Sequence, residues 1–191
     1  SHCLFENNLL GDDLVNVFDC NSVVFQDCEF NFSHADALDS DFSSISLTNC
    51  SFKSIGNDAV DGSGTDADIN DCYFENVEDK AISAGENSIF HLSSNVLNKC
   101  ALGLVVKDGS SLYEKNTRVD KCDLAFIAFN KKWQYGPPTA YIYSNILLAD
   151  EARYLVQNGS KIKSENNSIV KITANNVEDL LYGNVYGKSS R

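Results

Sequence analysis

The sequence has no methionine, only two prolines, one tryptophan and 15 basic residues among its 191 residues. Because Met is absent even from position 1, we expect Ser1-His2 to be a tag remnant on a domain of a longer parent chain, with any secretion signal upstream. No run of about 18 apolar residues occurs, which excludes a membrane-spanning helix. The net charge of −12 excludes nucleic acid as an expected partner, because phosphate binding needs a basic stripe.

Sequence motifs of common catalytic sites are absent as well. The chain has no nucleophile elbow, phosphate-binding loop, HExxH or dinucleotide fingerprint. Its seven cysteines show none of the CxxC spacing of zinc sites, and an odd number leaves at least one thiol unpaired within the chain. We expect these cysteines to be small buried hydrophobes rather than disulfides.

A repeat of 22 residues is the dominant feature that is present. It is carried by cysteines and by phenylalanines two positions further on, at Cys28, Cys50, Cys72, Phe30, Phe52 and Phe74. The period is too short for paired helices, and apolar and polar residues alternate within it as they do in strands. The sequence therefore predicts an all-β fold, a right-handed single-stranded parallel β-helix (a solenoid) with about 22 residues per coil.

The columns of this repeat define the expected domain organisation. One inward column is predicted to contain Leu38, Val60, Ile82, Leu104 and Phe126. We expect residues 1–191 to form a single β-helix domain, with regular coils over about 23–132 and a one-residue slip near 89–100. An aromatic insertion at 133–138, further coils at 139–173 and a C-terminal cap or tail at 174–191 complete the prediction.

Three segments carry a resemblance to a known family. DKAISAGENS (79–88), LGLVVKDGSS (102–111) and AFIAFNKK (125–132) resemble the repeats of bacterial right-handed parallel β-helix proteins, a superfamily that includes pectate-lyase-like enzymes and uncharacterised surface proteins. The resemblance covers residues 23–132 well and the remainder weakly. It implies a bacterial protein that is extracellular or at the cell surface, and it specifies the fold more strongly than the chemistry.

Stacked aspartates form the first candidate site. Asp36 and Asp58 fall in one column with Lys80 on the next coil, and Asp39 and Asp61 fall in another. Carboxylates about 5 Å apart repel by roughly 3 kcal/mol at an effective dielectric constant near 20, so some relief is expected. Calcium bound by Asp39 and Asp61, a proton shared as in glycoside hydrolysis, or a surface ion pair between Asp58 and Lys80 would supply it. The alternative is that these aspartates bind turn amides and face water.

A second set lies further along the same predicted strand. Glu86 and Asp108 share one column, and Lys107 and Lys131 stand beside them, either as surface ion pairs or as contacts to an acidic sugar. A lysine with a lowered pKa could act as the base of a uronate lyase, and Lys80 or Lys107 are the candidates. Trp133 and Tyr135 could form a stacking platform for a ligand, or they could cover an edge of the coil.

These residues leave two functions open. The first is a non-catalytic surface or secreted module whose acidic outer face binds glycan, calcium or a partner protein. The alternative is a polysaccharide lyase or glycoside hydrolase that uses Asp36, Asp39, Asp58 and Asp61, assisted by a lysine, on a polysaccharide held in an outer groove. None of the three arginines lies on the acidic coils, unlike the arginine placed near the base in the best-known uronate lyases.

Overall fold

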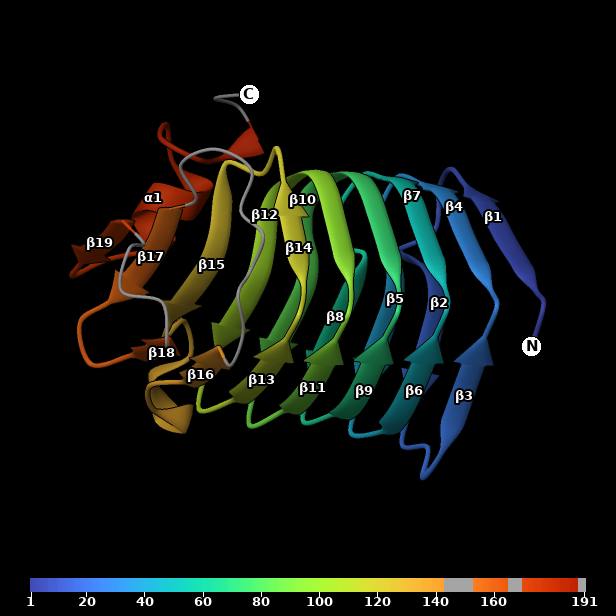
Figure 1. The fold of residues 1–191 in the computed structure, drawn as a ribbon, viewed down its shortest axis with the longest axis horizontal. Helices are drawn as coiled ribbons and strands as arrows, with labels where there is room; N and C mark the ends of the chain where they lie inside the picture. Colours follow the sequence, from blue (N-terminus) through green and yellow to red (C-terminus); the bar gives the residue numbers. More distant parts are fainter. Residues whose placement is uncertain (143–152, 165–169, 189–191) are drawn as a thin grey trace.

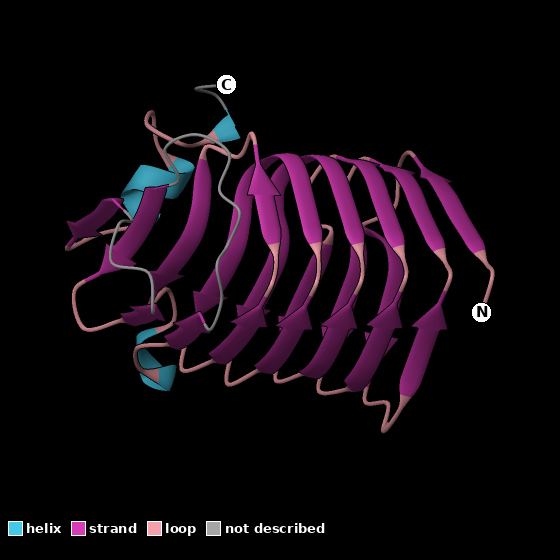
Figure 2. Cartoon of the chain, viewed as in Figure 1, coloured by secondary structure: helices cyan, strands magenta, loops and turns pink. Residues whose placement is uncertain are grey.

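The computed structural model describes residues 1–142, 153–164 and 170–188 of the chain. They form a parallel β-solenoid of about seven turns, with 61% strand, 5% helix and about 22 residues per coil (Figure 1). This confirms the predicted fold class. Figure 2 shows that strands run through almost every coil, with helical turns only in the insertion and near the C-terminus.

Each coil contributes to three faces. The first face contains β1 (Leu4–Asn8), β4 (Glu29–Ser33), β7 (Ser51–Ile55), the N-terminal parts of β10 (Tyr73–Gly85) and β12 (Val96–Lys107), and β14 (Arg118–Asp120). The second face contains β2 (Asp13–Phe18), β5 (Asp36–Asp41), β8 (Val60–Ser63), the C-terminal parts of β10 and β12, β15 (Leu124–Phe129), β17 (Arg153–Gln157) and β19 (Val170–Ala174). Long β10 and β12 bend from one face to the other, so these two faces form one 12-stranded sheet.

The third face is a separate seven-stranded parallel sheet. Its strands are β3 (Val23–Gln26), β6 (Ser44–Thr48), β9 (Asp66–Asn70), β11 (Ile89–Ser93), β13 (Ser111–Lys115), β16 (Thr139–Ile142) and β18 (Lys161–Ser164). A short 3₁₀ helix, η1 (Trp133–Tyr135), lies in the predicted insertion, between β15 and β16. The part of the predicted coils at 139–173 that falls on 143–152 and 165–169 lies outside the described residues.

Ladders of identical or similar side chains fill the core. The rings of Phe30, Phe52 and Phe74 are fully buried and stack with centroids 4.5 and 4.8 Å apart. Leu38, Val60, Ile82, Leu104 and Phe126 pair in register and are at most 1% exposed, as predicted. Each ladder places every apolar side chain against its counterparts one coil away, so burial and dispersion contacts repeat along the axis.

The register slip expected near 89–100 is present. Val77 pairs with Cys100 at an interval of 23, whereas Lys80 pairs with Leu102 at an interval of 22, so the ladder is irregular between Val77 and Lys80. Corners between faces are made by residues in left-handed conformation, for example Asp27, Asn49 and Asp71 with φ of 52°, 53° and 55°. Asp and Asn tolerate that conformation better than other non-glycine residues, which explains this polar column.

The C-terminal segment folds against the outside of the second face. Outward-facing Val105, Ile127 and Leu155 are fully buried because Val177 and Leu181, at the start and within α1 (Glu178–Tyr182), pack on them. A second apolar cluster therefore lies outside the coil, over its C-terminal half (Figure 1). Among the described residues, no helix is long and apolar enough to cross a membrane.

Candidate functional site

The second face carries the candidate site on its N-terminal coils. Parallel pairing places Asn16, Asp39, Asp61 and Ser83 in one outward column. Asp41 follows two residues after Asp39 on the same side of its strand. Asp13, Asp39, Asp41 and Asp61, which we call the acidic strip, are all partly exposed.

The carboxyl groups of the acidic strip repel one another. Burial, together with the negative charges of Asp41, Asp13, Asp61 and Asp36, raises the pKa of Asp39 to about 7. Its described hydrogen-bond partner is the side-chain amide of Asn16, whose Nδ2 donates to Oδ2 over 2.9 Å. Burial also raises the pKa of Asp13 and Asp41. Asp39 is therefore a proton-holding carboxyl group near neutral pH.

Asp61, the next carboxylate in the column, has the opposite environment. Burial alone would raise its pKa, but the Lys107 ammonium and the Ser83 hydroxyl outweigh burial and hold the pKa below its usual value. Lys107 Nζ lies 3.4 Å from Asp61 Oδ1 and reaches it across Gly85 on the intervening coil. A Cβ at Gly85 would lie 2.6 Å from Lys107 Cε, so glycine is required for this reach.

Asp58 and Lys80 form a buried ion pair rather than the surface pair that the sequence suggested. Lys80 Nζ lies 3.1 Å from Asp58 Oδ1 and 2.8 Å from Asp79 Oδ2, and these side chains are 4–11% exposed. Tyr182 of α1 lies over Lys80, with the ammonium 5.6 Å from the ring centroid. The surface interpretation is wrong because the C-terminal segment folds over this face. The 22-residue repeat gives no indication of that contact.

Asp36 and Asp58 also brace the backbone of the following coil. Asp36 Oδ1 accepts hydrogen bonds from Asn57 Nδ2 and from the backbone N–H of Asp58, at 2.6 and 2.8 Å. Asp58 Oδ1 accepts the backbone N–H of Lys80 at 3.1 Å. The interpretation in which these aspartates bind turn amides therefore holds for this column, although Asp58 does not face water.

The environment of both candidate lysines disfavours a role as base. Burial alone would lower the pKa of Lys80, but Asp58 and Asp79 outweigh it and raise the pKa well above the usual value. For Lys107, the charge of Asp61 likewise outweighs burial and raises the pKa of the ammonium group. A lyase base needs a neutral amine, whereas these two ammonium groups are held in the protonated state.

The second predicted set is largely structural. Asp108 is fully buried, and its Oδ1 accepts the backbone N–H groups of Lys131 and Lys132 at 2.7 and 2.5 Å. Glu86 is 8% exposed, accepts the Ser63 hydroxyl at 2.6 Å and pairs with Lys132. Surface pairing of Glu86, Lys107 and Asp108 is thus corrected to pairing and turn bracing within buried corners of the coil.

The remaining predicted residues lie at the periphery. Lys131 is exposed, and its ammonium lies 5.1 Å from the centroid of the Tyr182 ring. Trp133 and Tyr135 of η1 are 83% and 38% exposed, so neither ring is folded back into the coil. The insertion projects from the corner between the second and third faces. At this corner the Tyr135 carbonyl lies close to Gly109.

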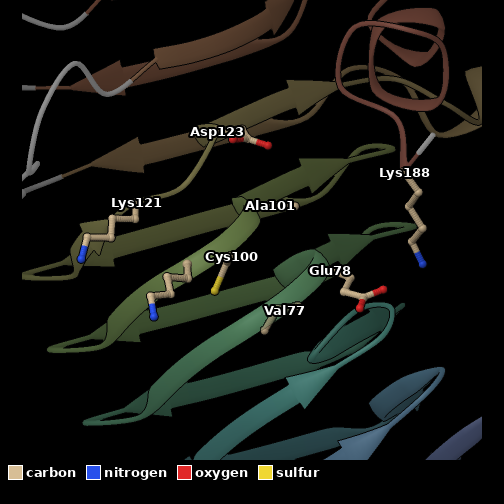
Figure 3. Close-up of a pocket in the computed structure, with 8 residues that line it drawn as sticks. Val77, Glu78, Cys100, Ala101, Lys121, Asp123 and Lys188 are labelled. Carbon is tan, nitrogen blue, oxygen red and sulfur yellow. The ribbon is translucent and has the colours of Figure 1, made fainter. Parts of the chain in front are cut away.

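A groove runs along the opposite corner, between the first and second faces. A hollow of about 490 Å³ is lined by Val77, Glu78, Lys99, Cys100, Ala101, Lys121, Asp123 and Lys188 (Figure 3). A second hollow of about 520 Å³ shares Val77, Glu78 and Lys99 and extends to His34. Lys188 spans this corner and donates to the carbonyl oxygen of Gly56 over 2.7 Å. The aspartates and lysines predicted for catalysis do not line it.

The acidic strip is the place where a cation could bind. Carboxylate oxygens are the ligands that calcium prefers, and calcium accepts several waters in addition. The described residues contain no group of three or more metal-ligating side chains gathered around one point. A cation on the strip would therefore need side-chain rotation or water ligands, since no closed cage is formed.

Several members of the site were not predicted from the sequence. Asp13 and Asp41 complete the acidic strip, Asp79 is the closer partner of Lys80, and Tyr182 covers the ion pair. Asp13 precedes Asp36 by 23 residues, the same slipped interval found elsewhere, so that signal was available in the sequence. Tyr182 lies outside the repeat and carried no such signal.

Comparison with known proteins adds no family assignment. Neither a scan against protein-family models nor a search of curated proteins finds a match to this chain. The parallel β-solenoid is therefore established by the structure itself, and the function must be argued from the site.

Proposed function

We propose that the chain is a non-catalytic β-helix module of a bacterial secreted or surface protein, and that its acidic strip binds calcium. The observation that carries this proposal is the environment of Asp39, where burial and the unrelieved repulsion of neighbouring aspartates together raise its pKa to about 7. Asp58 and Asp61 have lysine partners, whereas Asp39 is surrounded by four carboxylates. A divalent cation would favour the ionised form of Asp39 and relieve this repulsion.

A binding role suits the rigidity of the site. The carboxylates of Asp39 and Asp61 project from paired strands of a continuous sheet, so their spacing is set by the backbone. Glycan hydroxyls or a partner protein would be bound on the same face, through the cation or directly by carboxylate oxygens. The glycan and partner parts of the proposal, and the surface location, follow from the resemblance of 79–88, 102–111 and 125–132 to bacterial β-helix repeats.

Thermal unfolding with millimolar calcium and with chelator tests the proposal. We expect calcium to raise the Tm of the wild type by several degrees and to have no such effect on Asp39→Asn/Asp61→Asn. The matched control is Asp66→Asn/Asp68→Asn, which removes the same charge from exposed positions on the third face and should keep the calcium response. An equal response in both double variants, or none in the wild type, would refute a calcium site on the strip.

A glycoside hydrolase is a second candidate, favoured by the contrast between Asp39 and Asp61. The pKa of Asp39 is raised to about 7 and that of Asp61 is lowered, which is the division between a general acid and an ionised carboxylate. Registered strands lie about 4.8 Å apart, close to the roughly 5–5.5 Å between carboxyl groups in retaining enzymes.

Release of reducing ends from a panel of polysaccharides tests this candidate. Hydrolysis should depend on both Asp39 and Asp61, so either Asn variant should reduce it by at least about 100-fold, while Asp66→Asn should not. Retained activity in Asp39→Asn or Asp61→Asn, or a panel left intact by the wild type, would count against hydrolysis at this pair.

A further inference from the structure

A column of cysteines runs through the core beside the phenylalanine ladder. Glu29, Ser51 and Tyr73 pair in register, so the residues that precede them, Cys28, Cys50 and Cys72, occupy consecutive coils. We call these three the thiol ladder. They are 1–2% exposed, and all are free thiols. The acidic strip lies on a different face of the coil, so this cluster has no part in the function proposed above.

The spacing of the neighbouring phenylalanine rings indicates the spacing of the thiols in this ladder. Phe30, Phe52 and Phe74 follow the cysteines by two residues and point into the same core, and their centroids are 4.5 and 4.8 Å apart. Thiols on the same strands should have nearly the same separation. A metal–sulfur bond of about 2.3 Å gives a sulfur–sulfur span of about 4.6 Å in a linear, two-coordinate complex. The backbone repeat thus matches the span of two thiolates on either side of one metal ion.

The geometry also selects the class of metal. A straight column places no more than two of its sulfur atoms next to any one point, whereas zinc sites need four ligands in a tetrahedron. Among the described residues there is no group of three or more ligating side chains that could supply the others. Soft thiolate ligands in low coordination number favour monovalent ions such as Cu(I) over calcium or magnesium.

Charge balance also suits such an ion. In the metal-free chain the Cys50 thiol donates to the carbonyl oxygens of Phe25 and Thr48, and the Cys72 thiol donates to the carbonyl oxygen of Asn70. A monovalent ion between one thiolate and one thiol leaves no net charge in the apolar core, and one proton is released on binding.

The column reaches the surface at its N-terminal end. The Cys3 carbonyl accepts the N–H of Glu29, so Cys3 lies one coil before Cys28, and it is exposed. The column therefore begins at solvent and continues inward through Cys28 to Cys50. At the other end it stops at Asn95, whose Oδ1 accepts the backbone N–H of Cys72.

We propose that the thiol ladder binds a soft monovalent metal ion, Cu(I), in two-coordinate geometry between Cys50 and one neighbouring thiol, Cys28 or Cys72. This site is independent of the calcium proposal and uses none of its residues. Cys100 and Cys122 form another registered pair, so Cys122→Ser is used as the background in which the ladder is tested alone.

Competition with bicinchoninate for Cu(I) under anaerobic conditions tests the site. In the Cys122→Ser background we expect one tightly held ion, and adding Cys50→Ser should weaken binding by at least about tenfold because it interrupts both pairs of the ladder. Cys20→Ser, outside the ladder, and Asp39→Asn/Asp61→Asn are controls that should bind as the background does. Equal affinity with and without Cys50 would overturn the proposal.

A measurement on the unaltered chain covers the case in which Cys50→Ser fails to fold. Ag(I), an air-stable monovalent analogue, should protect Cys50 and a neighbouring thiol of the ladder from alkylation by iodoacetamide when the chain is unfolded in its presence and the modified residues are mapped by mass spectrometry. Protection should be lost when a competing thiol removes the silver. Uniform alkylation of all seven cysteines with and without Ag(I) would equally overturn the proposal.

Discussion

At the scale of single residues, the second face combines paired and unpaired charges within a few ångströms. Lys80 has two carboxylate partners and Lys107 has one, whereas Asp39 has an amide partner and four carboxylate neighbours. Asp58, Asp79, Lys80 and Lys107 are nearly inaccessible, whereas Asp39 and Asp61 are partly exposed. The inaccessible groups therefore act as internal braces, and a ligand can approach Asp39 and the exposed part of Asp61.

Asp39 makes folding stability depend on pH. Its pKa is raised in the folded state from 3.8 to about 7, so its stabilising contribution is fully present below the unfolded value and is lost as pH rises through about 7. The free energy of unfolding of Asp39→Asn, relative to that of the wild type, should therefore rise between pH 4 and pH 8 in the absence of calcium. After a discount for solvent screening, we expect this rise to be about 1–2 kcal/mol. Urea unfolding at several pH values measures the difference, and a pH-independent difference would contradict this environment.

Lys80 should be required for stability in a way that a surface lysine is not. Lys80→Met leaves Asp58 and Asp79 buried without a cation, which should lower the free energy of unfolding by about 3–5 kcal/mol. Adding Asp58→Asn should recover part of that loss, because one uncompensated carboxyl group is removed. Lys115→Met, at an exposed position, is the matched control and should change stability by less than about 0.5 kcal/mol. Similar small losses for both lysines in urea unfolding would mean that the Lys80 pair is not a buried brace.

At the scale of elements, each strand is stabilised mainly by its counterparts on neighbouring coils. The column of Leu38, Val60 and Ile82 and the slip between Val77 and Lys80 were predicted from the sequence because every coil repeats the same backbone path. The docking of α1 was not, since Val177 and Leu181 belong to no repeat and pack on the outer side of the sheet. Tyr182 of the same helix lies over Lys80, so the repeat alone could place Lys80 in a column but could not show that it is covered.

The phenylalanine ladder offers a test of this element-level packing. Phe52 stacks between Phe30 and Phe74 with interplanar angles of 5°, and Phe52→Ala would open a cavity between two coils. We expect a loss of about 3–5 kcal/mol in the free energy of unfolding. Phe32→Ala, on the same first face but 55% exposed, should cost far less. Comparable urea midpoints for the two variants would contradict the inward assignment of Phe52.

At the scale of the whole molecule, charge is segregated along the axis. Of the 27 acidic residues, 17 lie in residues 1–79, where Lys53 is the only lysine or arginine. The remaining 14 basic residues lie in 80–191, where they outnumber the acidic ones. Because a solenoid is stabilised by the interfaces between neighbouring coils, this asymmetry acts on one end of the stack rather than on the fold as a unit.

Self-repulsion should therefore weaken the N-terminal coils selectively at neutral pH and low ionic strength. We expect amide hydrogen exchange to be faster in β1–β9 than in β10–β15, and added salt to slow exchange mainly in the N-terminal strands, because exposed charges are screened over about 10 Å at 0.1 M. If calcium binds the acidic strip, millimolar calcium should give stronger protection that centres on β2, β5 and β8 and disappears in Asp39→Asn/Asp61→Asn. Uniform exchange along the solenoid, unchanged by salt, would show that the stacked core outweighs the charge asymmetry and that the acidic half is as stable as the rest.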